Sequence, residues 1–72
     1  MERITEMDKW AQAIIDSLPW QYKRKAFEGW WQEFNYHYGE EEISYKKINK
    51  GIYAANTRLR KFHNRLKEKG LV

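Results

Sequence analysis

The apolar residues in the C-terminal part of this 72-residue chain recur at alternating steps of three and four, without a break. Such spacing keeps them on one face of an α-helix, because the helix completes a turn about every 3.6 residues. The pattern predicts one long helix over about residues 43–69, whose apolar face other parts of the chain must cover. This face consists of Tyr45, Ile48, Ile52, Ala55, Leu59, Phe62 and Leu66.

Two shorter segments with helical spacing come before it. The apolar residues predict a first helix over about residues 5–16, and Thr5 with Asp8 resembles a capping box at its start. Pro19 fits the first turn of a second helix over about residues 19–37, because that position needs no N–H donor. One proline and four glycines leave little room for sheets or long loops.

The length and composition limit the classes of protein that this chain can form. A chain of 72 residues has room for one thin hydrophobic core. It has no cysteine, which excludes disulfides and cysteine-based zinc sites. No apolar run approaches the roughly 18 residues of a membrane span, and charged residues follow Met1 where a signal peptide would be apolar. We therefore expect a cytoplasmic, all-α, three-helix domain over residues 1–72, with a long basic C-terminal helix.

Two adjacent tryptophans in the second segment cannot both face the same neighbour, because they lie about 100° apart on a helix. Trp31 falls within a narrow aromatic sector, which we expect to face the core. The other members of this sector are Trp20, Phe27, Phe34 and Tyr38. Trp30 falls on the flank of this sector with Tyr22 and His37. Either the third helix covers Trp30 as well, or Tyr22, Trp30 and His37 form a ridge that binds a protein partner, since Trp and Tyr dominate binding hot spots.

Charge is distributed unevenly along the chain. Residues 1–42 contain five Lys and Arg against nine Asp and Glu, whereas residues 43–72 contain nine against one, a net charge of +8. One side of the third helix carries Lys47, Lys50, Arg58, Lys61 and Arg65. Another side carries Lys46, Arg60 and Lys67, with Tyr53, Thr57 and Asn64 between them. Such rows of cations favour contact with phosphates, and the interleaved polar side chains could reach bases or sugars. The alternative is a solvated helix face that the acidic half of the chain partly neutralises.

Two stretches of the sequence share features with known families. LRKFHNRLKEKGLV resembles the end of a winged-helix recognition helix, but the unbroken apolar face over residues 45–66 favours one continuous helix. WAQAIIDSLPWQYKRKAFEGWWQEF and AANTRLRKFHNRL together cover more of the chain. They resemble the helical region that precedes the catalytic domain of phage replication endonucleases, the gene A protein family of rolling-circle initiators. The shared features are a helix that ends in Leu-Pro, a basic and aromatic second helix, and an Ala-Ala-Asn-x-x-Leu-Arg segment.

This resemblance implies a phage or mobile-element origin, a bacterial host cell, and a role near DNA replication or packaging. The nicking chemistry of that family requires a His-x-His metal pair and paired catalytic tyrosines in a separate domain. This sequence has neither, since His37 and His63 stand far apart. The endonuclease activity is therefore not part of what the resemblance implies for this chain.

No pattern in the sequence predicts catalysis. Glu33 and His37 are one helical turn apart, but a single pair lacks the further ligands that a stable metal site needs. We expect no catalytic residue, metal or cofactor, and no membrane association. The favoured function is a binding module that contacts DNA, or a DNA-bound protein complex, through Lys47, Lys50, Arg58, Lys61, Arg65, Arg60 and Asn64. The alternative is an adaptor or inhibitor of a host or phage protein, acting through Tyr22, Trp30 and His37. A homodimer is also possible in principle, if the apolar face of the third helix is left uncovered.

Overall fold

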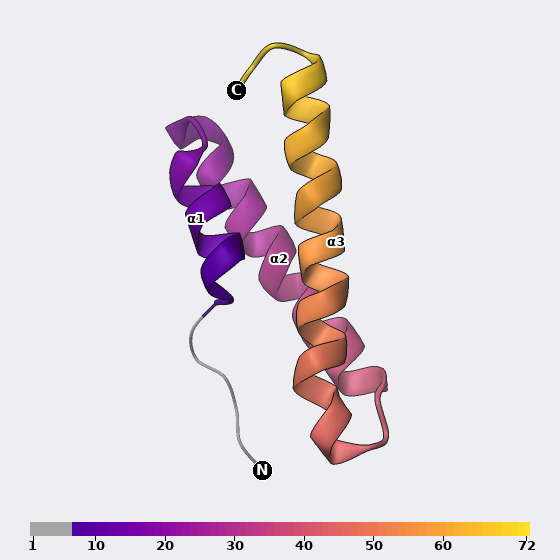
Figure 1. The fold of residues 1–72 in the computed structure, drawn as a ribbon. Helices are drawn as coiled ribbons and strands as arrows, with labels where there is room; N and C mark the ends of the chain where they lie inside the picture. Colours follow the sequence, from indigo (N-terminus) through magenta and orange to yellow (C-terminus); the bar gives the residue numbers. More distant parts are fainter. Residues whose placement is uncertain (1–6) are drawn as a thin grey trace.

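A computed structural model describes residues 7–72 of the chain as three α-helices (Figure 1). These are α1 (Lys9–Ser17), α2 (Trp20–Glu40) and α3 (Lys47–Glu68), with a short 3-10 helix, η1 (Ser44–Lys46), before α3. The longest pair, α2 and α3, form a helical hairpin, and α1 packs against both of them. Within the described residues there is no strand, so the predicted all-α, three-helix fold is confirmed. None of the helices over residues 7–72 is long and apolar enough to cross a membrane.

The first helix begins later than the sequence predicts. It starts at Lys9 rather than near residue 5, and Asp8 is its N-cap, with a side-chain oxygen 3.4 Å from the backbone N–H of Ala11. The capping box that was predicted to begin at Thr5 lies outside the described residues. An aspartate at this position accepts a hydrogen bond from one of the first N–H groups of the helix, for which the helix has no backbone carbonyl acceptor.

The third helix ends in a compact C-terminal cap. Gly70 adopts a left-handed conformation with φ of 71°, which a residue without a Cβ adopts at little cost. The N–H of Gly70 donates to the carbonyl of Lys67 at 3.0 Å, and the N–H of Leu71 donates to the carbonyl of Leu66 at 2.9 Å. These two bonds define a Schellman motif, which satisfies carbonyl groups that would otherwise lack partners at the end of the helix.

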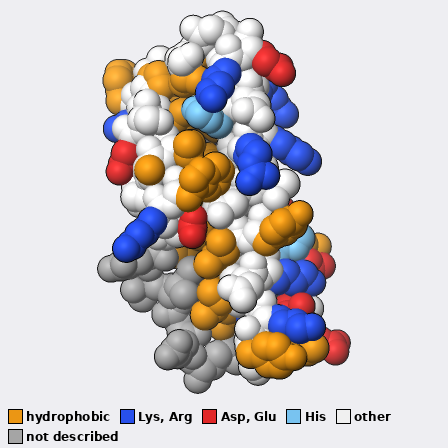
Figure 2. Space-filling model, in the orientation of Figure 1, with side chains coloured by type: hydrophobic (Ala, Val, Ile, Leu, Met, Phe, Trp, Pro, Cys, Tyr) orange, Lys and Arg blue, Asp and Glu red, His pale blue; other side chains and the backbone are white. Residues whose placement is uncertain are grey.

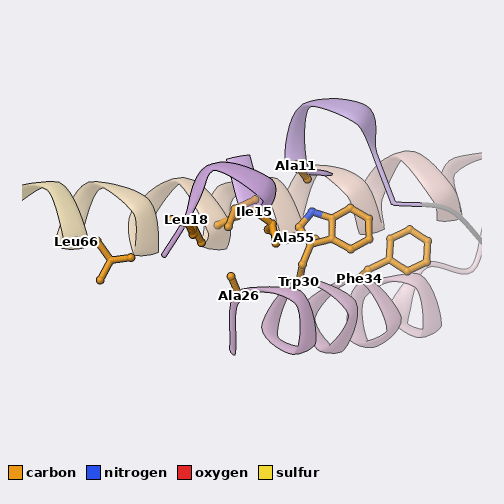
Figure 3. Packing of buried hydrophobic residues seen from close by; sticks show 9 residues of the cluster. Ala11, Ile15, Leu18, Ala26, Trp30, Phe34, Ala55 and Leu66 are labelled. Atoms are coloured by element: carbon orange, nitrogen blue, oxygen red, sulfur yellow. The ribbon is translucent and has the colours of Figure 1, made fainter. Parts of the chain in front are cut away.

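The core is small and its largest member is Trp30, which is only 1% exposed. The buried residues are Ala11, Ile15, Leu18, Ala26, Trp30, Phe34, Ala55, Leu59 and Leu66. The prediction that Trp31 faces the core and Trp30 lies on its flank is wrong, because Trp30 is buried and Trp31 is only half-buried. In Figure 3 the Trp30 side chain projects from α2 toward α1 and α3, which together cover it. The alternative that the third helix also covers Trp30 is the one the structure shows.

Hydrogen bonds around Trp30 tie the three helices together. Its Nε1–H donates to Oδ1 of Asn56 on α3 at 2.8 Å, and Nδ2 of Asn56 donates to Oδ2 of Asp8 at 3.3 Å. The polar atom of a buried indole normally finds a partner, because an unpaired donor in the interior destabilises the fold by about 1–3 kcal/mol. Asn56 therefore fixes how α2 and α3 are rotated and positions the start of α1 against them.

The aromatic sector of α2 faces the core only in part, because Phe34 is buried while Trp31 and Tyr38 pack against the core and stay partly exposed. Trp20 is 83% exposed and Phe27 is 45% exposed, whereas the buried line of α2 runs through Ala26, Trp30 and Phe34. The inward-facing side is thus displaced by roughly a fifth of a turn from the one that the sequence predicts. Both faces are aromatic, so hydrophobicity alone does not distinguish them.

Small residues explain which face of α2 turns inward. A Cβ added at Gly51 of α3 would lie 2.7 Å from Cδ2 of Phe34 and 3.0 Å from its carbonyl oxygen. Only a glycine permits this close approach, and it brings α3 over the Ala26, Trp30 and Phe34 side of α2. Gly51 is therefore a packing residue of the α2–α3 interface.

The apolar face of α3 is largely covered within the chain. Ala55, Leu59 and Leu66 are buried, while Tyr45 at the start of the predicted face is 79% exposed. Because α1 and α2 occupy this face, it does not provide the uncovered surface on which we based the possible homodimer.

Candidate nucleic-acid interface

An open groove of about 850 Å³ runs between α2 and α3. Five basic side chains line it, namely Lys25 from α2 and Lys50, Arg58, Lys61 and Arg65 from α3. Glu33 and His37 of α2 and Phe62 of α3 also line it. In the view of Figure 2, lysine and arginine side chains follow the length of α3. The structure therefore brings four of the predicted cations into one concave site, where low-dielectric walls strengthen a positive potential.

The groove follows from the spacing of residues on both helices. Lys50, Arg58, Lys61 and Arg65 share one flank of α3, beside its buried face. Lys25 shares a flank of α2 with Gly29 and Glu33 at steps of four residues, and the packing of the hairpin sets these two flanks opposite each other. Lys25 was missed by the sequence reasoning, because its place in the groove depends on which side of α2 packs against α3.

Arg58 crosses the groove at a glycine. A Cβ added at Gly29 would lie 3.5 Å from Nε of Arg58, so the guanidinium group passes directly over the backbone of α2. Nη1 of Arg58 donates to Oε2 of Glu33 at 3.0 Å. Glu33 and Gly29 together fix the position of this arginine at the mouth of the groove.

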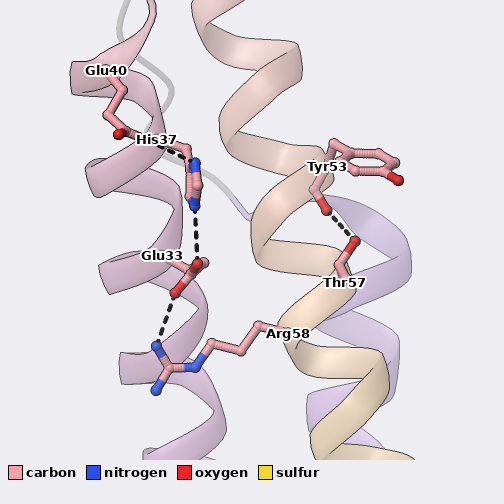
Figure 4. A network of polar contacts seen from close by, with 6 residues as sticks. All are labelled: Glu33, His37, Glu40, Tyr53, Thr57 and Arg58. Atoms are coloured by element: carbon pink, nitrogen blue, oxygen red, sulfur yellow. Dashed lines mark hydrogen bonds and ion pairs between the residues drawn. The ribbon is translucent and has the colours of Figure 1, made fainter.

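A chain of polar contacts continues from Arg58 along α2 (Figure 4). Nε2 of His37 lies 3.0 Å from Oε1 of Glu33, and Nδ1 of His37 lies 3.1 Å from Oε1 of Glu40. Partial burial acts to raise the pKa of Glu33, but hydrogen bonds from Arg58 and His37 and their positive charges outweigh it and lower the pKa below the usual 4.5. Glu33 is therefore an ionised carboxylate within a basic groove.

Most of the groove cations are available to an anionic ligand. Arg58 is paired with Glu33, and Nζ of Lys50 lies 4.0 Å from a carboxylate oxygen of Glu41. In contrast, Lys25, Lys61 and Arg65 form no ion pair with any carboxylate in residues 7–72. These three charges are free to neutralise phosphates without first breaking an internal ion pair.

The other predicted contact residues lie outside the groove. Nζ of Lys47 is 5.3 Å from the ring centroid of Tyr38, and the guanidinium carbon of Arg60 is 5.6 Å from that of Trp10. Both positions are typical of cation–π interactions. Asn64 is exposed on the same side of α3 as Arg60, as its spacing indicates.

Two of the polar residues that were predicted to reach bases, Tyr53 and Thr57, line the groove from α3. Tyr53 is 77% exposed and its ring points away from α2 (Figure 4), while the hydroxyl of Thr57 donates to the backbone carbonyl of Tyr53 at 2.8 Å. The groove thus combines its basic side chains with neutral ones, and the hydroxyl of Thr57 already has a backbone partner.

The predicted ridge for a protein partner is not formed. Trp30 is buried, Tyr22 packs against the core, and both ring nitrogens of His37 contact carboxylates of α2. Without Trp30 at the surface, these three residues do not form a continuous aromatic surface. This part of the sequence prediction is wrong because α1 and α3 both pack over Trp30.

No protein-family model, curated protein or solved structure matches this chain. The resemblance to the helical region of phage replication endonucleases therefore stays a prediction. Among residues 7–72 there is no group of three or more His, Cys, Asp or Glu side chains that could hold a metal ion. The chemistry that these residues offer is charge on a concave surface.

Proposed function

We propose that this protein is a non-enzymatic module that binds nucleic acid, with the groove between α2 and α3 holding the phosphate backbone. The observation that carries the proposal is the convergence of five Lys and Arg side chains from two helices, three of which form no ion pair with the carboxylates of residues 7–72. Cations placed in this way release the counterions condensed on a nucleic acid, which supplies most of the affinity in sequence-independent binding. A cytoplasmic site of action and a phage or mobile-element origin belong to the same proposal.

The dimensions of the groove are consistent with a strand of nucleic acid. Lys50 and Arg65 are fifteen positions apart on one helix, which corresponds to about 22 Å at 1.5 Å per residue. One strand of a duplex advances about 3.4 Å per phosphate, so this length corresponds to roughly six phosphates. The few side chains that could read bases lead us to expect micromolar, sequence-independent binding.

Fluorescence anisotropy with labelled random-sequence duplex and single-stranded DNA, at several salt concentrations, tests this proposal. The double variant Lys61→Gln with Arg65→Gln removes two unpaired groove cations. Lys46→Gln with Lys67→Gln is the matched control, because it removes the same charge from residues that do not line the groove. We expect the groove variant to lower the slope of log K against log salt by about 1.8 on duplex, and the control to lower it less. Equal losses in both variants, or no binding by the wild-type protein at low salt, would refute the proposal.

Substitution of Glu33 provides a second test, in which DNA affinity is expected to rise rather than fall. Replacing Glu33 with glutamine removes the only Asp or Glu carboxylate among residues 7–72 that lines the groove, and releases Arg58 from its ion pair. We expect Glu33→Gln to bind DNA several-fold more tightly at low salt, because one more cation becomes available and one repulsive charge is lost. Glu28→Gln is the control, since Glu28 is also on α2 but does not line the groove. Weaker binding by Glu33→Gln than by Glu28→Gln would contradict the proposed ligand site.

A further inference from the structure

The outward face of α2 carries an aromatic stripe of Trp20, Phe27 and Trp31 that neither α1 nor α3 covers fully. Trp20 is 83% exposed, Phe27 is 45% exposed and Trp31 is half-buried. The rings of Phe27 and Trp31 contact each other edge to face, with centroids 6.4 Å apart. The stripe extends over about 17 Å of helix, and contiguous exposed apolar surfaces of this kind mark sites of interaction.

The composition of the core explains why burial of this stripe would add to the stability of the protein. Three of the nine hydrophobic residues buried within the described part of the chain are alanines, and of twelve aromatic side chains only Trp30 and Phe34 are buried. A domain of this size gains little stability from one thin core, and oligomerisation is a common way to add buried apolar surface. Two of the four tryptophans, Trp20 and Trp31, are thus placed where a second molecule would bury them further.

The charges beside the stripe identify the partner as a second copy of this chain. Arg24 and Glu28 lie on the same edge of the stripe, with Nε of Arg24 2.9 Å from Oε1 of Glu28. If two α2 helices pack antiparallel about a two-fold axis near residue 26, Arg24 of each copy lies opposite Glu28 of the other. The same axis sets Trp20 of each copy opposite Trp31 of the other. A surface whose charges match themselves after a two-fold rotation meets one requirement of an isologous dimer.

We propose that the protein forms an antiparallel homodimer through the aromatic stripe of α2. The stripe lies about half a turn around α2 from Lys25 and Glu33, which line the basic groove. The dimer therefore leaves both grooves open on its outer sides. It does not use the apolar face of α3, which α1 and α2 cover, and it forms without any nucleic acid.

Sedimentation equilibrium of the whole chain without nucleic acid, from about 1 μM to about 1 mM, tests the dimer. The wild-type mass is expected to rise from the 8.9 kDa of one chain toward twice that value. Trp20→Glu is expected to weaken dimerisation at least tenfold, because it places a charge in the interface. Tyr36→Glu is the matched control, since Tyr36 is also exposed on α2 but lies on a different face. Circular dichroism checks that both variants keep the helical fold, which we expect because both side chains lie at the surface.

Charge reversal tests the antiparallel arrangement separately. Arg24→Glu places like charges opposite each other and is expected to weaken the dimer, while Arg24→Glu combined with Glu28→Arg is expected to restore it. A wild-type mass of 8.9 kDa at every concentration overturns the dimer. Equal dimerisation of Trp20→Glu and Tyr36→Glu overturns the use of the stripe. A double reversal that stays as weak as the single one overturns the two-fold arrangement.

Discussion

Replacing Gly51 with alanine tests how α2 and α3 pack. In an ordinary helix interior the exchange stabilises by about 0.5–1 kcal/mol, because glycine loses more backbone entropy on folding. Here the new Cβ would lie 2.7 Å from Cδ2 and 2.8 Å from Cε2 of Phe34, and 3.0 Å from its carbonyl oxygen. The Phe34 ring has no free space to move into, since it is 4% exposed and stacks on Trp30 with 5.5 Å between the ring centroids.

The expected result is a net loss of stability. Overpacking of a dense core costs about 1–3 kcal/mol of stability. The upper part of that range is expected here, because the new Cβ would contact both backbone and a ring that cannot move away. After the gain in helix propensity, we expect Gly51→Ala to lower the free energy of unfolding by about 1–2 kcal/mol. In a domain of this size each kcal/mol corresponds to a shift in Tm of about 4–8 °C.

Gly39 is the matched control, because it also lies in a helix and a Cβ added there would meet nothing within 4 Å. Urea unfolding followed by circular dichroism gives both free energies. We expect Gly39→Ala to raise stability by up to about 1 kcal/mol, the opposite sign from Gly51→Ala. If Gly51→Ala stabilised the protein as much as Gly39→Ala, α3 would not approach α2 at Phe34 and the packing described here would be wrong.

Three further changes address the buried hydrogen bonds and the ion pairs of the groove. Trp30→Phe removes the indole N–H that donates a hydrogen bond to Asn56. We expect urea unfolding to show that the free energy of unfolding falls by at least about 1 kcal/mol, and an unchanged value would mean that this hydrogen bond is dispensable. Asp8→Ala removes the N-cap of α1 and an acceptor for Asn56, and should cost about 1 kcal/mol more than Asp8→Asn, which keeps a capping oxygen. The pKa of Glu33 is lowered from 4.5 in the folded protein: burial acts to raise the pKa, but the hydrogen bonds and charges of Arg58 and His37 together outweigh it. The ionised carboxylate of Glu33 therefore stabilises the folded protein at pH values above its pKa in the unfolded chain. This stabilisation is lost as the pH falls through the pKa of Glu33 in the folded protein. The free energy of unfolding of Glu33→Gln should therefore fall less over that acid range than the free energy of unfolding of the wild type.

Part of the groove was predictable from one helix alone. Lys50, Arg58, Lys61 and Arg65 share a flank of α3, and helical periodicity is enough to place them on the same side. Lys25 joins them only because α2 packs beside that flank. Its contribution depends on which side of α2 faces α3, which no local pattern specifies.

Glu33 and His37 of α2 show the same limit of reasoning from local sequence patterns. The spacing of Glu33 and His37 predicts that they are neighbours on one helix, and the structure has their side chains 3.0 Å apart. The stronger partner of Glu33 is Arg58, twenty-five residues further along the chain. A contact of that sequence separation is set by the packing of the hairpin.

The sequence by itself determined the three helices, their approximate bounds and the concentration of positive charge in α3. These features depend on local periodicity, on helix breakers such as Pro19 and on composition. Only the tertiary structure decided that Trp30 rather than Trp31 is buried, because α2 has two aromatic faces of similar hydrophobicity. The close approach permitted by Gly51 and the hydrogen bond from Trp30 to Asn56 select between them. The same rotation of α2 turns Lys25 toward the cations of α3 and leaves Trp20 and Phe27 at the surface.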